Sequence, residues 1–459
     1  MKKLFAITLA FCAMLIMAAE KKPKYIFIFI GDGMSTPQRM IANEYATHTD
    51  HGPLTINTLK YHATTYTASS NALVTDSAAA ATAIACGEKT NNGVIGITPT
   101  GDGKLVSSAE IAHKNGKKVG IVTSVIINHA TPAGFYAHRK NRSMYYGIGL
   151  DLIDSGFEYF AGGGFGGHHD KKDDKDYKGN LYDLAAQAGY KVCRDKASFE
   201  ALKAGDGKVL AVGFDGVEGN IPFAIDGPDN IPTLEAMTAK GIELLDNPNG
   251  FFMMVEGGKI DHCGHANDAA SNMEEVMAFD DAVRVAFAFA EKHKDETLIV
   301  VTGDHETGGM TMGFAGGGYS FSIELLKAQK CSAAIFNSYY AEARKAKEDF
   351  NFEDAKVLLN KYFSFKFEGD PKKDKLVVKP NELKTLEDAF NKDQEKKPPT
   401  TAALTSAARV LLSTKSGIGW STGSHTALPT LTTSQGVGAE LFTGLLDNTD
   451  ISKKIKSLL

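Results

Sequence analysis

The chain has 459 residues, carries a formal net charge of −5 and is 43% hydrophobic. Its length and apolar content predict a sizeable core, and they allow one large domain with an insertion or two to three domains. The charge is only mildly negative and no basic block is present, which argues against nucleic acid as a dedicated partner.

Residues 1–19 have the pattern of a secretory signal peptide. Two lysines precede an apolar run over residues 4–17, and Ala18 and Ala19 follow it. The run is short for a membrane anchor, so we predict a leader that is cleaved after Ala19 and a periplasmic or secreted protein. No other segment is long and apolar enough for a bilayer, so we expect no membrane span.

Four apolar runs, at residues 25–30, 119–124, 251–255 and 298–302, predict buried strands. Continuous runs of apolar, β-branched and aromatic residues are typical of strands that are covered on both faces. Helical patterns such as 107–115 and 272–293 lie between them. This alternation predicts an α/β fold, a three-layer sandwich with a central, mostly parallel sheet flanked by helices.

A helix is expected to begin at residues 75–77. Thr75 and Asp76 can open it, and the following alanines favour its continuation. Ser77 would then lie at a helix N-terminus, where free N–H groups and the positive dipole end favour a phosphate group. Taken alone, the stretch fits better an ordinary N-cap before a buried helix of small residues, and only the rest of the chain favours the phosphate site.

Side chains that can bind metals follow each predicted strand at once or within a few residues. They are Asp32, His129 and Thr131, Glu256, and the pair Asp304 and His305. Ligand sites of open α/β sheets lie beyond the carboxyl ends of the strands. We therefore expect these side chains to converge at one edge of the sheet.

Further candidate ligands follow later in the chain. Asp261 and His265 are four residues apart and share a face if the segment is helical. Carboxylate oxygen and imidazole nitrogen are both zinc ligands. His425 stands alone in a loop of glycine and serine, and we interpret it as a further ligand.

Residues 311–414 differ from the rest in composition. They contain helical patterns rich in alanine, lysine and glutamate, and charge runs at 372–375 and 395–399. We interpret them as a mostly helical insertion. It divides a core at residues 20–310 from a C-terminal part of that core at residues 415–459.

Four cysteines follow the leader: Cys86, Cys193, Cys263 and Cys331. In an oxidising compartment they allow one or two disulfide bonds, with three possible full pairings. Their spacing matches no zinc motif, and the sequence leaves their pairing open.

Short motifs occur through the chain in a fixed order, at residues 31–34, 75–79, 129–133, 141–142, 256–265, 302–309 and 423–425. Each is weak alone, but the ordered set covers most of the chain outside the insertion. As a set it resembles the bacterial alkaline phosphatase family. The resemblance implies a hydrolase of small-molecule phosphate monoesters that works at alkaline pH through a phosphoserine, with two zinc ions and one magnesium ion. It also implies a homodimer, which is common in the family.

The resemblance further implies roles for single residues. Ser77 would be the nucleophile, and Arg142 would hold the phosphoryl oxygens. One zinc ion would take Asp261, His265 and His425. The other would take Asp32, Asp304, His305 and the Ser77 oxygen, and magnesium would take Asp32, Thr131 and Glu256.

Two histidines depart from the pattern of some bacterial members. His129 stands where those members have aspartate, and His262 where they have lysine; both are closer to the animal enzymes. Imidazole at the third site could favour zinc over magnesium. His262 is equally explained as a surface histidine beside a ligand.

Two other functions fit parts of the sequence. A phosphodiesterase or sulfatase of the same superfamily would share the metal ligands, but Ser77, Arg142 and the third-metal residues together argue against both. A non-catalytic phosphate- or metal-binding protein would need no nucleophile beside two metals, and an assay of phosphate release separates it from an enzyme.

Overall fold

The computed structural model describes residues 22–167, 177–227, 229–315, 317–396 and 401–459. The signal peptide predicted for residues 1–19 lies outside this part of the chain. No helix in the described part combines the length and apolar character that crossing a membrane requires.

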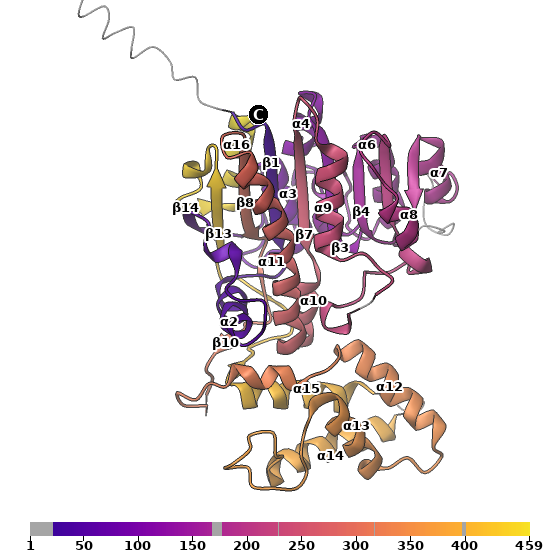
Figure 1. Ribbon diagram of the computed structural model, residues 1–459, viewed down its shortest axis with the longest axis vertical. Coiled ribbons are helices and arrows are strands. Elements are labelled where there is room, and N and C mark those ends of the chain that lie inside the picture. Colours follow the sequence, from indigo (N-terminus) through magenta and orange to yellow (C-terminus); the bar gives the residue numbers. More distant parts are fainter. Residues whose placement is uncertain (1–21, 168–176, 228, 316, 397–400) are drawn as a thin grey trace, which may run out of the picture.

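A ten-stranded sheet forms the centre of the molecule, in the order β14-β2-β13-β8-β1-β7-β3-β4-β6-β5 (Figure 1). Strand β13 is antiparallel to both of its neighbours, and all other pairs are parallel. The mostly parallel sheet predicted from the sequence is therefore confirmed. Its strands are β1 (Tyr25–Gly31), β2 (Tyr61–Tyr66), β3 (Lys118–Ile126), β4 (Tyr159–Gly163), β5 (Tyr190–Cys193), β6 (Lys208–Val212), β7 (Phe251–Gly257), β8 (Thr297–Gly303), β13 (Thr430–Gly436) and β14 (Gly444–Asp447).

Strand β1 shows why the sheet is covered on both faces. All seven of its residues are buried. Tyr25, Phe27 and Phe29 contribute to the core on one face, and the intervening isoleucines contribute to the core on the other. Successive side chains of a strand point to opposite faces, so a continuous apolar run needs a helical layer on each side.

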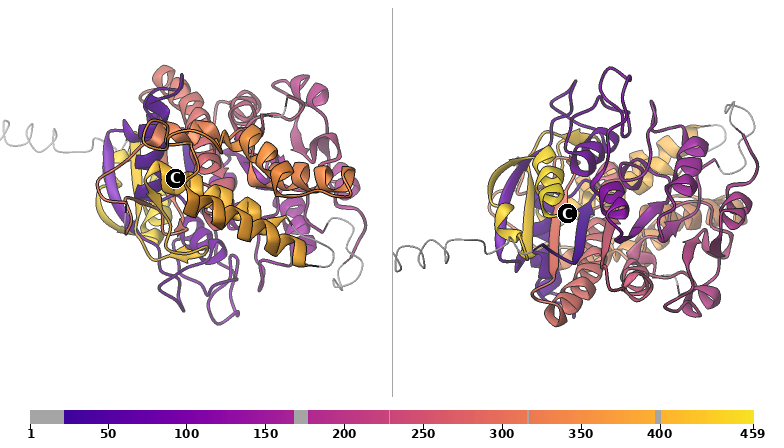
Figure 2. Two further views of the ribbon diagram at one scale, coloured as in Figure 1. Left: turned by 90° about the horizontal axis from the view of Figure 1, so that it is seen from below. Right: turned by 90° about the horizontal axis from the view of Figure 1, so that it is seen from above.

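Helices supply these two layers, which Figure 2 shows from the ends of the strands. One face is covered by α2 (Thr36–Thr47), α8 (Lys196–Glu200), α9 (Leu234–Leu245) and α11 (Ala269–Lys292). The other is covered by α3 (Ser77–Cys86), α4 (Ser108–Lys114), α5 (Ala130–Ala133), α6 (Tyr145–Ser155), α7 (Leu181–Gln187) and α16 (Asn448–Leu458). The predicted three-layer sandwich is thus confirmed.

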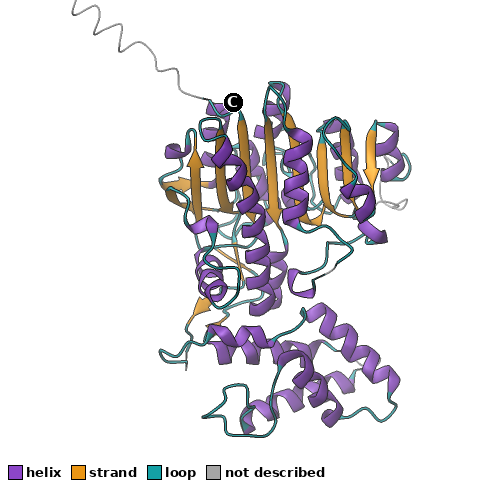
Figure 3. Ribbon diagram, in the orientation of Figure 1, coloured by secondary structure: helices purple, strands orange, loops and turns teal. Residues whose placement is uncertain are grey.

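A separate group of helices lies beyond the carboxyl ends of the central parallel strands (Figures 1 and 3). It comprises α12 (Ala333–Ala346), α13 (Phe352–Phe363), α14 (Pro380–Glu395) and α15 (Ala402–Ser416), preceded by a short 3-10 helix at Ile323–Ala328. Short antiparallel strands, β10 (Thr311–Met312) and β11 (Ile418–Gly419), join the two ends of this segment. The helical segment therefore begins and ends at neighbouring points of the molecule, where β10 and β11 pair.

The four cysteines whose pairing the sequence left open are buried free thiols in the described chain. Burial raises the pKa of the Cys86 thiol to about 12, and it raises the pKa of Cys331 to about 12 as well. Because the thiolate is the reactive form, these side chains act as small apolar residues of the core.

Candidate active site

The candidate residues gather at the carboxyl edge of the central strands. Gly31 of β1 is in register with Gly257 of β7 and Gly303 of β8. Asp32 and Asp304 therefore follow the carboxyl ends of two adjacent strands, β1 and β8. The remaining candidates come from β7, from the segment after β3, from α3, from α10 (Lys259–Ala266) and from the late strand β12 (His425–Thr426).

Ser77 is the first residue of α3 and is buried. Asp76 caps the helix, because its Oδ1 accepts a hydrogen bond of 3.0 Å from the N–H of Ala79. The Oγ of Ser77 lies 3.1 Å from Nε2 of His305. The serine hydroxyl thus lies at the positive end of a helix and points at a candidate metal ligand.

A first group of possible ligands consists of Asp261, His265 and His425. The two Nε2 atoms lie 3.2 Å apart, and they lie 3.4 Å (His265) and 3.5 Å (His425) from Oδ1 of Asp261. Both Nδ1 atoms face backbone carbonyls, that of Gly423 at 2.7 Å and that of Thr75 at 2.8 Å. An Nδ1–H that donates to a carbonyl leaves the Nε2 lone pair free for a metal, as expected for zinc.

A second group consists of Asp32, Asp304 and His305, all fully buried. Nε2 of His305 lies 3.3 Å from Oδ1 of Asp32 and 3.3 Å from Oδ2 of Asp304. Neither of these two carboxylate oxygens has a hydrogen-bond partner. Buried carboxylate oxygens without partners are costly, and a divalent cation would satisfy both.

Thr307 connects the first group to the second. Its hydroxyl donates to Oδ1 of Asp261 at 2.5 Å, so at His305 it accepts, and the Nδ1 of that histidine lies 3.3 Å away. His305 then carries its hydrogen on Nδ1, and its Nε2 lone pair faces Ser77 and the carboxylates. His305 also lies within ligand distance of Asp261 and His425, so it lies between the two groups.

A third group consists of Asp32, His129 and Glu256, with Thr131 beside it. The hydroxyl of Thr131 donates to Oδ2 of Asp32 at 3.2 Å. Oε1 of Glu256 and Nδ1 of His129 are buried without a partner. Carboxylate and hydroxyl oxygens suit magnesium, while the imidazole widens the choice of metal.

His262 lies near the third group but outside the three sets of ligand-distance contacts. Its ring centre is 6.1 Å from that of His129. Its Nδ1 lies 3.4 Å from the amide nitrogen of Asn220. The structure thus places His262 at the border of the site rather than among the ligand atoms.

Arg142 reaches the same edge from the loop that follows α5. Its guanidinium bonds Oδ2 of Asp76 at 3.0 Å and lies 3.3 Å from Nε2 of His129. Asp76 also caps the helix that begins with Ser77, so this one side chain positions both the guanidinium and the serine. Planar N–H groups beside a serine at a helix start are suited to hold a phosphate group.

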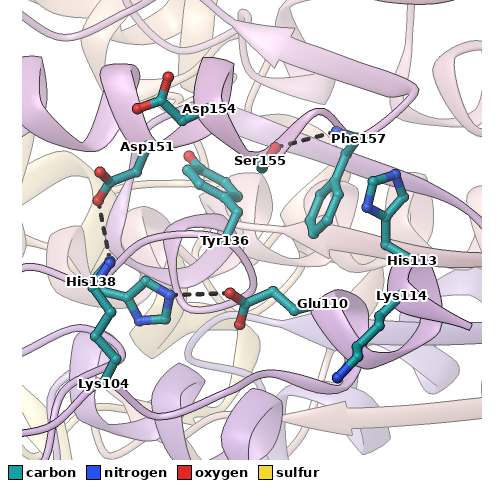
Figure 4. Close-up of a pocket in the computed structure, with 10 residues that line it drawn as sticks. All are labelled: Lys104, Glu110, His113, Lys114, Tyr136, His138, Asp151, Asp154, Ser155 and Phe157. Carbon is teal, nitrogen blue, oxygen red and sulfur yellow. Dashed lines mark hydrogen bonds and ion pairs between the residues drawn. The ribbon is translucent and has the colours of Figure 1, made fainter.

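The loop that carries Arg142 is anchored on its far side. Asp151 of α6 accepts from the backbone N–H of His138 at 3.1 Å and from Nε of Arg139 at 2.8 Å. Figure 4 shows the adjoining pocket of about 340 Å³, in which His138 also pairs with Glu110 at 3.1 Å. These contacts fix the backbone immediately before Arg142.

Burial and mutual repulsion make the carboxyl groups poor acids in the absence of a cation. Burial and the neighbouring carboxylates raise the pKa of Asp32 well above its ordinary value. Burial is also the largest cause that raises the pKa of Glu256 to about 8 and that of Asp304 to about 7. Asp261 differs: burial opposes its ionisation, but contacts with His425 and other imidazoles outweigh burial and lower its pKa. A bound cation would favour ionisation throughout the cluster.

Two threonines that complete the site have no sequence signal of their own. Thr307 makes the bridge described above, and the hydroxyl of Thr123 in β3 donates to Oε2 of Glu256. Threonine is common in strands and loops, so only the folded arrangement distinguishes these two from the others.

An α/β sheet whose carboxyl edge gathers a helix-start serine, a guanidinium and three sets of possible metal ligands defines a class of hydrolases that act on phosphate esters. The profile described as "Alkaline phosphatase" matches residues 23–459. The chain therefore belongs to the alkaline phosphatase family and is a phosphomonoesterase.

Relatives of known name agree with this assignment. The chain is 32% identical over 455 residues to alkaline phosphatase 3 of Bacillus subtilis, and the match covers 95% of this chain and 90% of the relative. The crystal structure of a cold-active alkaline phosphatase from Shewanella sp. is similar with a TM-score of 0.78 and 30% identity, covering 95% of this chain and 99% of that one. A TAB5 alkaline phosphatase in which a histidine is replaced by aspartate, with magnesium in its M3 site, gives a TM-score of 0.65 and 27% identity, with 95% and 98% covered.

Proposed function

We propose that this phosphomonoesterase acts through a phosphoserine on Ser77 at alkaline pH, with two zinc ions and one magnesium ion. The observation that carries the proposal is the position of the Ser77 hydroxyl, at the start of α3 and 3.1 Å from His305, between the groups of possible ligands. Bound divalent cations would supply the positive charge that stabilises a serine alkoxide and the departing oxygen.

The protein groups have separate tasks in this reaction. Ser77 Oγ attacks phosphorus in line with the bond to the leaving group. The bond between Oγ and phosphorus forms as the bond to the leaving oxygen breaks, and the serine proton is released to that oxygen, which departs as an alcohol. Arg142 holds two non-bridging oxygens, while the contact with Asp76 fixes the plane of its guanidinium. Water then cleaves the phosphoserine, returning the proton to Ser77 and releasing inorganic phosphate.

The ligand sets proposed for the metals are those that the family resemblance implies. Asp261, His265 and His425 would hold one zinc ion, and Asp32, Asp304, His305 and Ser77 the other. Asp32, Thr131 and Glu256 would hold magnesium. Each set contains atoms that lie within ligand distance of one another or lack a partner, which supports the assignment.

The third site is the one most open to a change of metal. His129 lies within ligand distance of Asp32 and Glu256. Imidazole favours zinc relative to an all-oxygen set. We propose that His129→Asp shifts this site toward magnesium, and the related TAB5 variant with an aspartate in place of a histidine, which holds magnesium, supports this direction.

Three further proposals concern the whole protein. Residues 1–19 would direct it to the periplasm or outside the cell and would then be removed, which N-terminal sequencing of the mature protein tests. It would form a homodimer, which sedimentation tests. Residues 311–414 would be an insertion in a core made of residues 20–310 and 415–459, and the helices there would shape access or association.

The central test combines metal analysis with hydrolysis of a generic phosphomonoester. The purified enzyme should contain close to two zinc ions and one magnesium ion per chain. Prolonged chelation should abolish phosphate release, and zinc with magnesium should restore it. An enzyme that keeps its activity after its metals have been removed would contradict the proposal. Full activity on a matched diester would favour a phosphodiesterase instead.

A further inference from the structure

Glu306 is a fully buried carboxylate next to His305, and it belongs to none of the three ligand groups. It lies in β9 (Glu306–Thr307), which pairs antiparallel with β12. In that pairing Glu306 is opposite Thr426, and Thr307 is opposite His425. The side chain is therefore at the centre of the segments that carry ligands, without being a ligand.

Four donors surround this carboxylate. Oε1 accepts from Nε2 of Gln38 at 2.7 Å and from the N–H of Met310 at 3.0 Å. Oε2 accepts from the hydroxyl of Thr426 at 2.5 Å and from the N–H of Gly309 at 3.0 Å. An ionised carboxylate has about four acceptor positions, so these partners saturate it. Saturation explains how the charge tolerates burial, and it leaves no lone pair for a metal ion.

The donors come from three different segments, and each segment carries proposed metal ligands. Gln38 is in the first turn of α2, which follows Asp32 closely. Gly309 and Met310 end the loop that begins with Asp304 and His305. Thr426 is the neighbour of His425 in β12.

We propose that Glu306 is a positioning residue that holds these three segments at the separation the metal ions require, and so controls how tightly the protein keeps its zinc. This inference rests on the proposed function, because it assumes that zinc binds these residues. A second hydrogen bond between the first and second segments supports the proposal, because Gln38 also donates to the carbonyl of Thr307 at 3.1 Å. In the absence of Glu306, backbone pairing, this amide and the bond of 3.1 Å from the N–H of Gly33 to Oδ1 of Asp304 would still connect the first two segments, but the carboxylate that joins all three would be lost.

Glu306→Gln tests the inference with almost no change of shape. All four partners donate and each oxygen accepts from two of them, so the new NH₂ group must face two donors. Both of these bonds are lost, or only one of them if the hydroxyl of Thr426 turns to accept. Loss of a partner that orients ligands typically costs roughly 10- to 100-fold in metal affinity. We expect zinc to pass from Glu306→Gln to a chromophoric chelator roughly 10- to 100-fold faster than from the wild-type enzyme.

A second pair of variants keeps the test valid if Glu306→Gln fails to fold. Thr426→Val removes the donor from β12 and should release zinc faster, whereas Thr426→Ser keeps the hydroxyl and should release it at the wild-type rate. Asp280→Asn is the matched control. Asp280 is also fully buried, and both of its oxygens accept hydrogen bonds, but its donors are Thr55, Ile56 and Arg284, none of which belongs to a ligand-bearing segment. Asp280→Asn should lower the melting temperature and leave zinc release unchanged.

The outcomes separate this inference from the proposed function. If the wild-type protein takes up no zinc, the proposed function fails and the inference fails with it. If the wild type binds zinc but a folded Glu306→Gln or Thr426→Val variant releases it at the wild-type rate, only the inference is overturned. Equal acceleration in Asp280→Asn would also overturn it, because the effect would then follow from general loss of stability.

Discussion

The Oγ of Ser77 and the Nε2 of His305 lie 3.1 Å apart, although 228 positions separate the two residues in the chain. One stands at the start of α3 and the other just beyond the end of β8. Thr307 holds the imidazole with its Nδ1 turned away, so the Nε2 lone pair faces the serine hydroxyl. This contact joins the proposed nucleophile to the proposed zinc ligands.

Ser77→Ala should lower kcat by roughly 10³- to 10⁶-fold, the range over which removal of a nucleophile acts in enzymes that form covalent intermediates. Zinc content and melting temperature should stay close to the wild-type values, because Asp32, Asp304 and His305 would still hold the second zinc ion and the hydroxyl is not needed to fold α3. Steady-state phosphate release and metal analysis check both points. Ser457→Ala, on the exposed surface of α16, is the matched control. Wild-type kcat in the Ser77 variant would refute its assignment as nucleophile.

Arg142→Ala should reduce kcat/KM for a phosphate monoester. The reduction should correspond to a loss of roughly 2–4 kcal/mol of transition-state stabilisation, the scale for removal of one preorganised donor. A monoester dianion offers two free oxygens to the guanidinium, and negative charge on them must be stabilised during transfer. A diester has lost one of these oxygens to a second alcohol. The kcat/KM for the diester should therefore fall much less than that for the monoester, and the ratio between the two values should become smaller.

Arg142→Lys should restore only part of the monoesterase activity, because an ammonium group cannot bridge two oxygens as a planar guanidinium does. Lys140→Ala removes an exposed cation from the same loop, and it should leave kcat/KM unchanged for both the monoester and the diester. Values of kcat/KM for a matched monoester and diester decide the matter. Equal proportional losses on both substrates would show that Arg142 does not set the preference.

The metal-free protein should lose stability as the pH rises from about 6.5 to above 8. Burial raises the pKa of Asp304 to about 7 and that of Glu256 to about 8 in the folded protein. In the unfolded chain both groups are ionised above about pH 5. The folded state thus binds more protons in this window, and its free energy of unfolding falls until both groups have ionised. Burial lowers the pKa of His129 to about 3, and it also lowers the pKa of His262 and of His305, so all three imidazoles are neutral in the folded protein. In the unfolded chain they lose their protons around pH 6.5, so they oppose the decline only at the lower end of the window.

The melting temperature of chelator-stripped protein, measured across this pH window, checks whether stability falls as the pH rises. Histidines of raised pKa, such as His51 and His113, act in the same direction. Comparison with Glu256→Gln isolates the carboxyl, since that variant should show a shallower decline. The metal-loaded enzyme should not decline in this way, because metal ligands bind in their deprotonated forms. A melting temperature that rises with pH in the stripped protein would contradict the prediction.

Phe390→Ala tests whether the helices beyond the sheet are independent of the metal site. Phe390 of α14 is buried, and its ring centre lies 5.6 Å from that of Phe352 and 6.2 Å from that of Phe350. Truncation should cost about 3–5 kcal/mol of stability. The loss should appear as faster proteolysis and hydrogen exchange within residues 323–416, with unchanged zinc release. Loss of zinc binding in an otherwise folded variant would show that these helices support the metal site directly.

The central strands could be predicted from the sequence because burial on both faces demands continuous apolar runs. Strands β2 and β13 could not, because they are rich in threonine and polar residues. The structure shows why they are nevertheless tolerated in the sheet. The hydroxyl of Thr432 bonds those of Thr65 and Thr302, each at 2.7 Å, so these buried polar groups satisfy one another across three strands.

The candidate site was predictable to the extent that its residues lie in short motifs at strand ends. The contacts that orient them were not, because they join distant segments. Thr307 reaches Asp261 across 46 positions, and Gln38 reaches Glu306 across 268. No local pattern in the sequence marks such partners, since their function depends on the fold that brings them together.

The position of β1 has a consequence for the timing of synthesis. This strand is among the first parts of the described chain, yet its partners β7 and β8 follow it by about 225 residues or more. At a translation rate of roughly 5–20 residues per second, the backbone of β1 waits about 10–45 s for β7, the nearer of its two partner strands in the sequence, and the central sheet cannot form before then. During that interval the nascent chain presents an aggregation-prone segment near its beginning. Chaperone binding to residues 25–31 is therefore expected to protect the growing polypeptide until the later strands emerge from the ribosome.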